Sequence, residues 1–285
     1  MDVKLRPGRP EDAVTCGQIC YDAFATLAAA HGMPCDFPSA EAATGLVTAL
    51  LDRPGLFSIV AEADGRVVGS NFLDERAVIA GVGPITVDPA VQDGSIGRRL
   101  MEAVLERAEE RGAAGVRLVQ TAYHVRSLSL YAKLGFEARE PLACMAGPPL
   151  GLVVGGRAVR PAGAADLGAC NRLCRVVHGH DRSPQVSDAL DAGSALVVEH
   201  DGRITGYSAG LSFFAHSVGE TVEDIQALIG AATGFGGPGI LVPVRDGELF
   251  RFCLEHGLRV VQLMTLMSIG LYNEPAGAYL PAIMY

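Results

Sequence analysis

The sequence is poor in positive charge and has no long apolar run, and these two absences exclude several classes of protein. Its 285 residues hold 23 Lys and Arg against 32 Asp and Glu, a formal net charge of -9. No stretch combines clustered Lys or Arg with aromatic residues, as a nucleic-acid binder would. No window approaches the roughly 18 to 20 uncharged apolar residues of a membrane span. We therefore expect neither nucleic acid nor membrane as a partner.

The amino terminus also lacks the basic and then apolar pattern of a signal peptide, so we expect a cytoplasmic protein. Seven cysteines are present, but no Cys or His pairs have zinc-finger spacing. We therefore expect no metal site. His178 and His180 alternate in a polar segment, where solvent exposure is the expectation.

The sequence contains an internal duplication. Arg6, Pro7, Asp12, Cys16 and Cys20 recur as Arg160, Pro161, Asp166, Cys170 and Cys174, each 154 positions later. The cysteines of each copy are spaced i, i+4, as buried thiols on a helix would be. A β-hairpin signal also occurs twice, with Asp-Gly at 64–65 and at 201–202. A Gly/Pro-rich break at 147–156 separates the copies, so we predict two domains at 1–148 and 157–285.

Residue periodicity predicts the elements of the first half. Helices are expected at about 10–29, 40–52, 95–111 and 125–134, and strands at 57–63, 66–74, 79–87, 116–121 and 136–146. The predicted fold class is α/β (α+β): each domain is a mixed, mainly antiparallel, twisted sheet flanked by helices.

The segment from Pro84 to Arg99 runs from a strand through a turn into a helix. Small residues at the turn, Gly94, Ser95 and Gly97, let backbone N–H groups approach a phosphate, and Arg98 and Arg99 follow at once. A Gly-containing turn of this kind can also be a plain tight connection.

A second segment, HVRSLSLYAKLGF at 124–136, predicts a helix with Tyr131 near its end and Gly135 as its terminator. In this order the two segments resemble the GNAT superfamily of acyl-CoA-dependent N-acyltransferases over residues 1–146. The family pattern Gln/Arg-x-x-Gly-x-Gly/Ala is similar to residues 92–97, and Leu-Tyr-x-Lys-x-Gly-Phe matches residues 130–136. Ser95 stands where a glycine is usual, and His124 where an asparagine is usual.

The resemblance implies a site for acetyl-CoA as cosubstrate, without a metal. It assigns coenzyme contacts to the strand, the turn and the later helix: Ile85, Thr86, Val87, Gln92, Asp93, Gly94, Ser95, Ile96, Gly97, Arg98, His124 and Ser127. Tyr131 corresponds to the hydroxyl beside the thioester sulfur, where it suits the role of the acid that protonates the departing thiolate. The alternative is a core-facing tyrosine with a structural hydrogen bond. Serine keeps its backbone N–H, so coenzyme binding should survive at Ser95, although a positive φ there would weaken this expectation.

The general base is less well defined by the sequence. Asp74, Glu75 and His124 are candidates, and Glu75 near a strand end is the choice, although carboxylates there are usually solvated. A backbone N–H of the strand at 85–87 would polarise the carbonyl.

The second half has lost the corresponding features. Cys253 takes the place of Tyr131. The helix expected at 222–233 takes the place of the coenzyme helix, but acidic residues at its start, Glu220, Glu223 and Asp224, would repel a pyrophosphate. We expect this half to keep the fold without the chemistry, as in tandem GNAT proteins of the YitH type with a degenerate C-terminal domain. It would shape the acceptor pocket, with the chain end packed across the groove.

The sequence thus predicts an acetyl-CoA-dependent N-acetyltransferase that acts on a small-molecule amine by direct attack in a ternary complex. The alternative is an acyl-CoA-binding sensor or pseudoenzyme without turnover. An O-acyltransferase, or a donor with a longer acyl chain, is also open. The residues identify neither the acceptor nor the oligomeric state.

Overall fold

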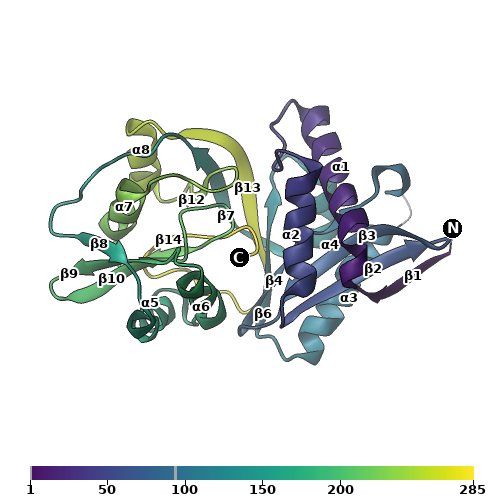
Figure 1. The fold of residues 1–285 in the computed structure, drawn as a ribbon, viewed down its shortest axis with the longest axis horizontal. Helices are drawn as coiled ribbons and strands as arrows, with labels where there is room; N and C mark the ends of the chain where they lie inside the picture. The colour runs from purple at the N-terminus through teal and green to yellow at the C-terminus, as the bar shows by residue number, and fades with distance from the viewer. Residues whose placement is uncertain (1, 93–94) are drawn as a thin grey trace.

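The polypeptide forms two bodies that lie side by side (Figure 1). This computed structural model describes residues 2–92 and 95–285. Within those ranges no helix is long and apolar enough to cross a membrane.

The first half builds most of one body. Its strands and helices are, in chain order, β1 (Val3–Pro7), α1 (Ala13–His31), α2 (Ala40–Asp52), β2 (Leu56–Ala63), β3 (Arg66–Asp74), β4 (Ile79–Val82), β5 (Thr86–Val87), α3 (Ile96–Glu110), β6 (Gly115–Thr121), α4 (Val125–Lys133) and β7 (Glu137–Ala146). Two short 3₁₀ helices, η1 (Pro10–Asp12) and η2 (Pro89–Val91), precede α1 and α3. The predicted helices and strands are confirmed except at 79–87, where the chain forms two strands.

The second half repeats this order. Its elements are β8 (Ala158–Pro161), η3 (Ala164–Asp166), α5 (Leu167–His178), α6 (Ser183–Asp191), β9 (Leu196–His200), β10 (Arg203–Ser208), β11 (Ser217–Gly219), α7 (Val222–Ala231), β12 (Ile240–Pro243), α8 (Gly247–Glu255), β13 (Arg259–Gly270) and β14 (Ala278–Leu280).

The duplicated residues play the same structural part in both halves. Arg6 Nη1 lies 2.7 Å from Asp12 Oδ2, and Arg160 Nη1 lies 2.7 Å from Asp166 Oδ2. Both Asp-Gly turns have positive φ at each residue, as a two-residue hairpin of type I′ requires. The four duplicated cysteines are buried and unpaired. The duplication is therefore one of structure as well as sequence.

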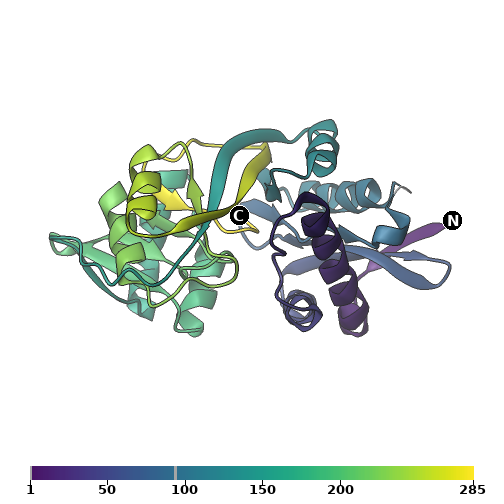
Figure 2. The same cartoon turned by 90° about the horizontal axis from the view of Figure 1, so that it is seen from above.

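The two halves exchange a strand. The larger sheet has the order β1-β2-β3-β4-β6-β13-β7-β12, with β5 beside β3. Thus β13 of the second half pairs with β6, while β7 of the first half pairs with β12. Both ribbons cross from one body to the other in Figure 2. A second sheet, β14-β11-β10-β9-β8, completes the second body. Main-chain hydrogen bonds therefore tie the halves together, and the larger sheet contains strands from both sides of the predicted break at 147–156.

Helices cover both faces of the first body. On one face, α3 buries a stripe at helical spacing, Ile96, Leu100, Val104 and Ala108, against β2, β3, β4 and β6. On the other face α1 and α2 pack against Val60 and Phe72. Together with the antiparallel pairing of most strands, this confirms the predicted fold class.

Candidate functional site

A cavity of about 800 Å³ lies where β4 and β6 separate. The two strands pair in parallel only from Ile79 with Gly115 to Gly81 with Arg117. Beyond that point residues 82–87 form one wall, and residues 118–121 form another. Pro84 has no N–H to donate to a ladder, which accounts for the division of the predicted strand 79–87 into β4 and β5. The sheet is open there, and the predicted contacts Ile85, Thr86 and Val87 all line the cavity.

The turn before α3 forms one end of the cavity. Gln92, Ser95, Gly97 and Arg98 line it, whereas Ile96 is buried in the core. The predicted contacts Asp93 and Gly94 lie outside the described residues. The first intrahelical bond runs from Arg99 N to Ser95 O, so the N–H groups at the start of α3 have no partner within the helix. These donors and the positive end of the helix dipole suit an anion.

Ser95 adopts the left-handed conformation, with φ 61° and ψ 9°. A residue with a Cβ pays about 1–2 kcal/mol for it. The positive φ explains why glycine is usual there in the family that the sequence resembles, and it weakens the expectation that coenzyme binding survives with serine at this position. The N–H at Ser95 is retained nonetheless.

Two arginines flank this turn, Arg98 as expected and Arg126 in place of Arg99. Arg98 lines the cavity and bonds Glu102 through Nε at 2.8 Å, while Arg126 donates from Nη2 to the Gln92 carbonyl at 2.7 Å. Arg99 points elsewhere, because its Nη1 donates to the Val3 carbonyl at 2.7 Å. Arg126, from α4, was not identified from the sequence.

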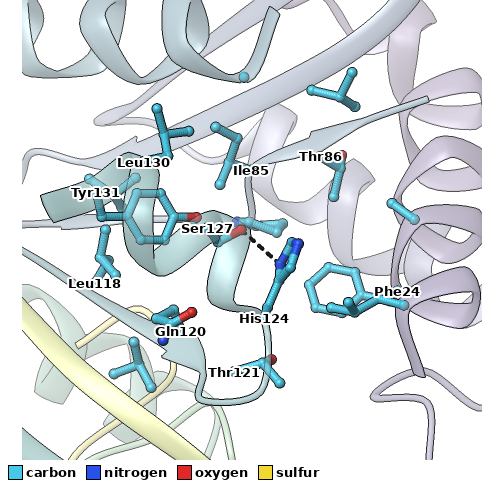
Figure 3. Close-up of a pocket in the computed structure, with 18 of the residues that line it drawn as sticks. Phe24, Ile85, Thr86, Leu118, Gln120, Thr121, His124, Ser127, Leu130 and Tyr131 are labelled. Carbon is cyan, nitrogen blue, oxygen red and sulfur yellow. Dashed lines mark hydrogen bonds between the residues drawn. The ribbon is translucent and has the colours of Figure 1, made fainter. Parts of the chain in front are cut away.

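One face of α4 places three polar side chains in a row, since positions 124, 127 and 131 recur at helical spacing. His124 Nδ1 lies 2.7 Å from Ser127 Oγ, and both line the cavity together with Tyr131 (Figure 3). Tyr131 is 6% exposed, and burial raises its pKa to about 12, an effect that a hydrogen bond with Ser127 partly offsets. Burial lowers the pKa of His124. At neutral pH the tyrosine is therefore protonated and the histidine is uncharged.

Glu75 is not placed to act as the base. Its carboxylate accepts from Arg107 Nε at 2.6 Å and Arg107 Nη2 at 2.7 Å, and it is not among the residues that line the cavity. Asp74 is likewise engaged by Arg76 and by Gln185, whose Nε2 lies 3.0 Å from Oδ2. The choice of Glu75 is corrected: both carboxylates serve ion pairs at the end of β3. Of the three candidates, only His124 lines the cavity.

Two polar residues in the cavity were missed by the sequence reasoning. Gln120 on β6 is 5% exposed, and neither atom of its amide has a hydrogen-bond partner. Asp36 lies between α1 and α2 and is half-buried, with Oδ1 accepting from Gln262 Nε2 at 2.6 Å. Burial raises the pKa of Asp36. Neither residue belongs to a motif, and Gln262 comes from the exchanged strand β13, so no local signal pointed to them.

The second half lines the other end of the cavity. Its contributions are Phe213, Phe214, Met264, Ile283 and Met284. Its own counterpart of the phosphate turn is closed: Asp224 Oδ2 accepts from Thr221 N at 3.0 Å, and Arg157 Nε lies 2.9 Å from Asp224 Oδ1. Cys253 is buried in α8. The acidic side chain thus occupies the helix terminus that a phosphate would need.

Two histidines of the second half are buried, contrary to expectation. His178 and His180 are 4% and 6% exposed, and the Nε2 atom of His180 lies 3.1 Å from the Tyr285 hydroxyl. Burial lowers the pKa of His178 to about 3 and that of His180 to about 4. The described residues contain no group of three or more His, Cys, Asp and Glu side chains that could hold a metal ion.

Comparison with known proteins gives consistent matches. Residues 27–136 match the acetyltransferase (GNAT) family. An IAA acetyltransferase from Azospirillum brasilense is 32% identical over 104 residues, which are 36% of this chain and 68% of that protein. A proposed acetyltransferase from Pyrococcus horikoshii superposes with a TM-score of 0.74 at 16% identity, over 97% of this chain and 94% of that one. A tandem GNAT protein from the clavulanic acid biosynthesis pathway superposes with a TM-score of 0.55 at 15% identity, over 94% of this chain and 98% of that one. These two structures show a shared fold.

Proposed function

Because the chain belongs to the acetyltransferase (GNAT) family, and is therefore an acyltransferase, we propose that it moves an acetyl group from acetyl-CoA to the amine of a small molecule. One observation supports this above the others. A single cavity extends from the N-terminus of α3, past the buried hydroxyl of Tyr131, to a half-buried carboxylate at Asp36. Along its length the cavity therefore offers an anion site, an acid and a second compartment for the acceptor, in that order.

The coenzyme occupies the end built by the first half. Its pyrophosphate binds the free N–H groups at the start of α3, with Arg98 and Arg126 beside it. Its pantetheine arm lies along Ile85, Thr86 and Val87, since β5 pairs with β3 on one side only. The Oγ1 atom of Thr86 is buried without a partner, as expected of a group that meets a ligand.

Transfer proceeds by attack of the neutral amine on the thioester carbonyl, so the C–N bond forms as the C–S bond breaks. A backbone N–H at 85–87 stabilises the oxyanion. Tyr131 donates its proton to the departing sulfur. A phenol with a pKa of about 12 is a weak acid, yet burial also raises the pKa of thiols in this protein, to about 12 for Cys20 and Cys144. Burial beside Tyr131 would raise the pKa of the departing thiol in the same direction as that of the phenol, which favours transfer of the proton to sulfur.

His124 completes the proton path. An ammonium substrate first loses one proton to water, and the neutral His124 then accepts the second proton from the nitrogen after attack. Ser127 lies between His124 and Tyr131, so this proton can return along α4 to the phenolate. The net result is one proton moved from nitrogen to sulfur.

The second half acts as a wall of the acceptor compartment and has no transferase site of its own. The closed terminus at Asp224, the cysteine at position 253 and the side chains that it adds to the cavity support this.

The proposal is tested by incubating the protein with acetyl-CoA and a panel of small amines, while the free coenzyme thiol and the acetylated product are measured. Amine-dependent thiol release with matching product supports transfer. Binding of acetyl-CoA without turnover for every amine favours the sensor or pseudoenzyme.

A further inference from the structure

The charges that line the cavity are divided between its two ends. Arg98, Arg126 and Lys133 lie with the coenzyme turn and α4, whereas Asp36 is the one carboxylate among the described lining residues. The cationic end matches the phosphates of the coenzyme. The opposite end therefore favours one positive charge on the second substrate.

Asp36 is held in place for such a charge. Gln262 Nε2 donates to Oδ1 at 2.6 Å, and Gln262 is itself contacted by the Tyr123 hydroxyl, 3.4 Å from its Oε1. Among the described residues no Lys, Arg or His forms an ion pair with Asp36. Burial therefore raises its pKa without a compensating cation. A bound ammonium would supply the missing charge.

The rest of this compartment is apolar. Phe24 and Phe37 meet edge to face with ring centroids 5.3 Å apart, and Phe213 with Phe214 at 5.6 Å in the same geometry. Met284 adds a flexible apolar side chain from the chain end. Walls of this kind bind the body of a hydrophobic molecule, and among the described lining residues they offer no second carboxylate for another ammonium group.

Gln120 supplies the neutral polar contact near the middle of the cavity. Its amide is buried without a partner, and Figure 3 shows it below Tyr131 and to one side of His124. Its carbonyl can accept one N–H of an amine as the nitrogen moves toward the thioester. The buried amide and the carboxylate are thus two independent indications of a ligand with a single nitrogen head.

We propose that the acceptor is a hydrophobic monoamine, with one amino group on an arylalkyl or alkyl body, and that Asp36 is the positioning residue for its ammonium group. This rests on the proposed acetyl transfer and narrows its substrate class. Polyamines and aminoglycosides, which carry several charges, are poor substrates because each additional ammonium would be buried without a carboxylate partner.

The test compares three probes and two variants. Steady-state rates with acetyl-CoA are measured for 2-phenylethylamine and spermidine. Binding of 2-phenylethylamine and of 2-phenylethanol, its uncharged analogue, is measured by calorimetry. Asp36→Asn removes the charge at constant size, and Asp52→Asn does the same at the exposed end of α2. Circular dichroism confirms the fold of both variants. Binding of acetyl-CoA is measured separately for each.

We expect kcat/KM for 2-phenylethylamine to exceed that for spermidine at least tenfold, and 2-phenylethanol to bind more weakly than the amine. Asp36→Asn should raise KM for the amine about 10- to 100-fold with a small change in kcat, as expected for loss of one charged hydrogen bond. Asp52→Asn should behave as wild type.

A preference for spermidine, or an unchanged KM in Asp36→Asn, would overturn the inference. If acetyl-CoA still binds and another amine is acetylated, the proposed function stands while the substrate class fails. If acetyl-CoA does not bind and no amine is acetylated, both fail.

Discussion

Replacing Tyr131 with phenylalanine removes one oxygen atom from a site where the structure gives that atom a chemical task. The hydroxyl is buried, and burial raises its pKa to about 12, so it is protonated at neutral pH. Tyr131→Phe keeps the ring and its edge-to-face contact with Phe136, whose centroid is 6.1 Å away. The change is therefore a deletion of the acid, with little effect on packing.

General acid catalysis by a positioned side chain contributes about 10²–10⁴-fold, so we expect kcat to fall about 100- to 1,000-fold. The hydroxyl lies away from the phosphate turn, so the dissociation constant for acetyl-CoA should change less than about twofold. The lost hydrogen bond to Ser127 should lower the free energy of unfolding by about 1 kcal/mol.

The assay is the rate of coenzyme thiol release at saturating amine, with calorimetry for coenzyme binding. Tyr272→Phe is the matched control, because that hydroxyl lies outside the cavity lining. Ser127→Ala should lose about tenfold, since it breaks the path from His124 while leaving the acid in place. If Tyr131→Phe keeps kcat within threefold of wild type, Tyr131 is not the acid and the proposed mechanism is wrong.

Three further predictions concern residues outside that step. Glu75→Gln should leave kcat unchanged and lower the free energy of unfolding by about 1–2 kcal/mol, because it weakens the pair with Arg107, and a large loss of rate would restore Glu75 as base. Ser95→Gly should raise the free energy of unfolding by about 0.5–1 kcal/mol, because glycine adopts the left-handed backbone conformation without strain. A lower melting temperature would contradict the strain argument. Acidification should destabilise the fold between pH 6.5 and about 4. In this range the histidines of the unfolded chain bind protons, whereas His178 and His180 stay neutral in the folded chain because burial lowers their pKa values to about 3 and about 4. For His178 this is worth about 3 kcal/mol at pH 4, and His178→Gln should flatten the calorimetric pH profile by that amount.

Much of the first half could be predicted from sequence, because its signals are local. The stripe of α3, the Asp-Gly turns and the terminator at Gly135 each occupy a few residues and report backbone geometry directly. Gly83 and Pro84 also indicate the division between β4 and β5, but the β-rich run from 79 to 87 favoured the prediction of one continuous strand.

The strand exchange could not be predicted, because β7 and β13 are equivalent copies and neighbouring strands usually pair along the chain. The contacts at the site that depend on this exchange could not be predicted either. Gln262 reaches Asp36 only because β13 lies beside β6. Glu75 failed for a different reason: a carboxylate at a strand end reveals nothing of an arginine 32 residues further along.

The most direct test of the account is calorimetric titration with acetyl-CoA of wild type, Gly97→Ala and Gly97→Glu. A Cβ at Gly97 would lie 3.8 Å from Val87 Cγ2 and 3.9 Å from Leu130 Cδ2, which is ordinary contact, so the alanine side chain fits there. The account predicts binding by wild type, near-normal binding by Gly97→Ala, and loss of at least 100-fold in Gly97→Glu, whose carboxylate would face the pyrophosphate. Failure of wild type to bind, or equal binding by Gly97→Glu, would contradict it.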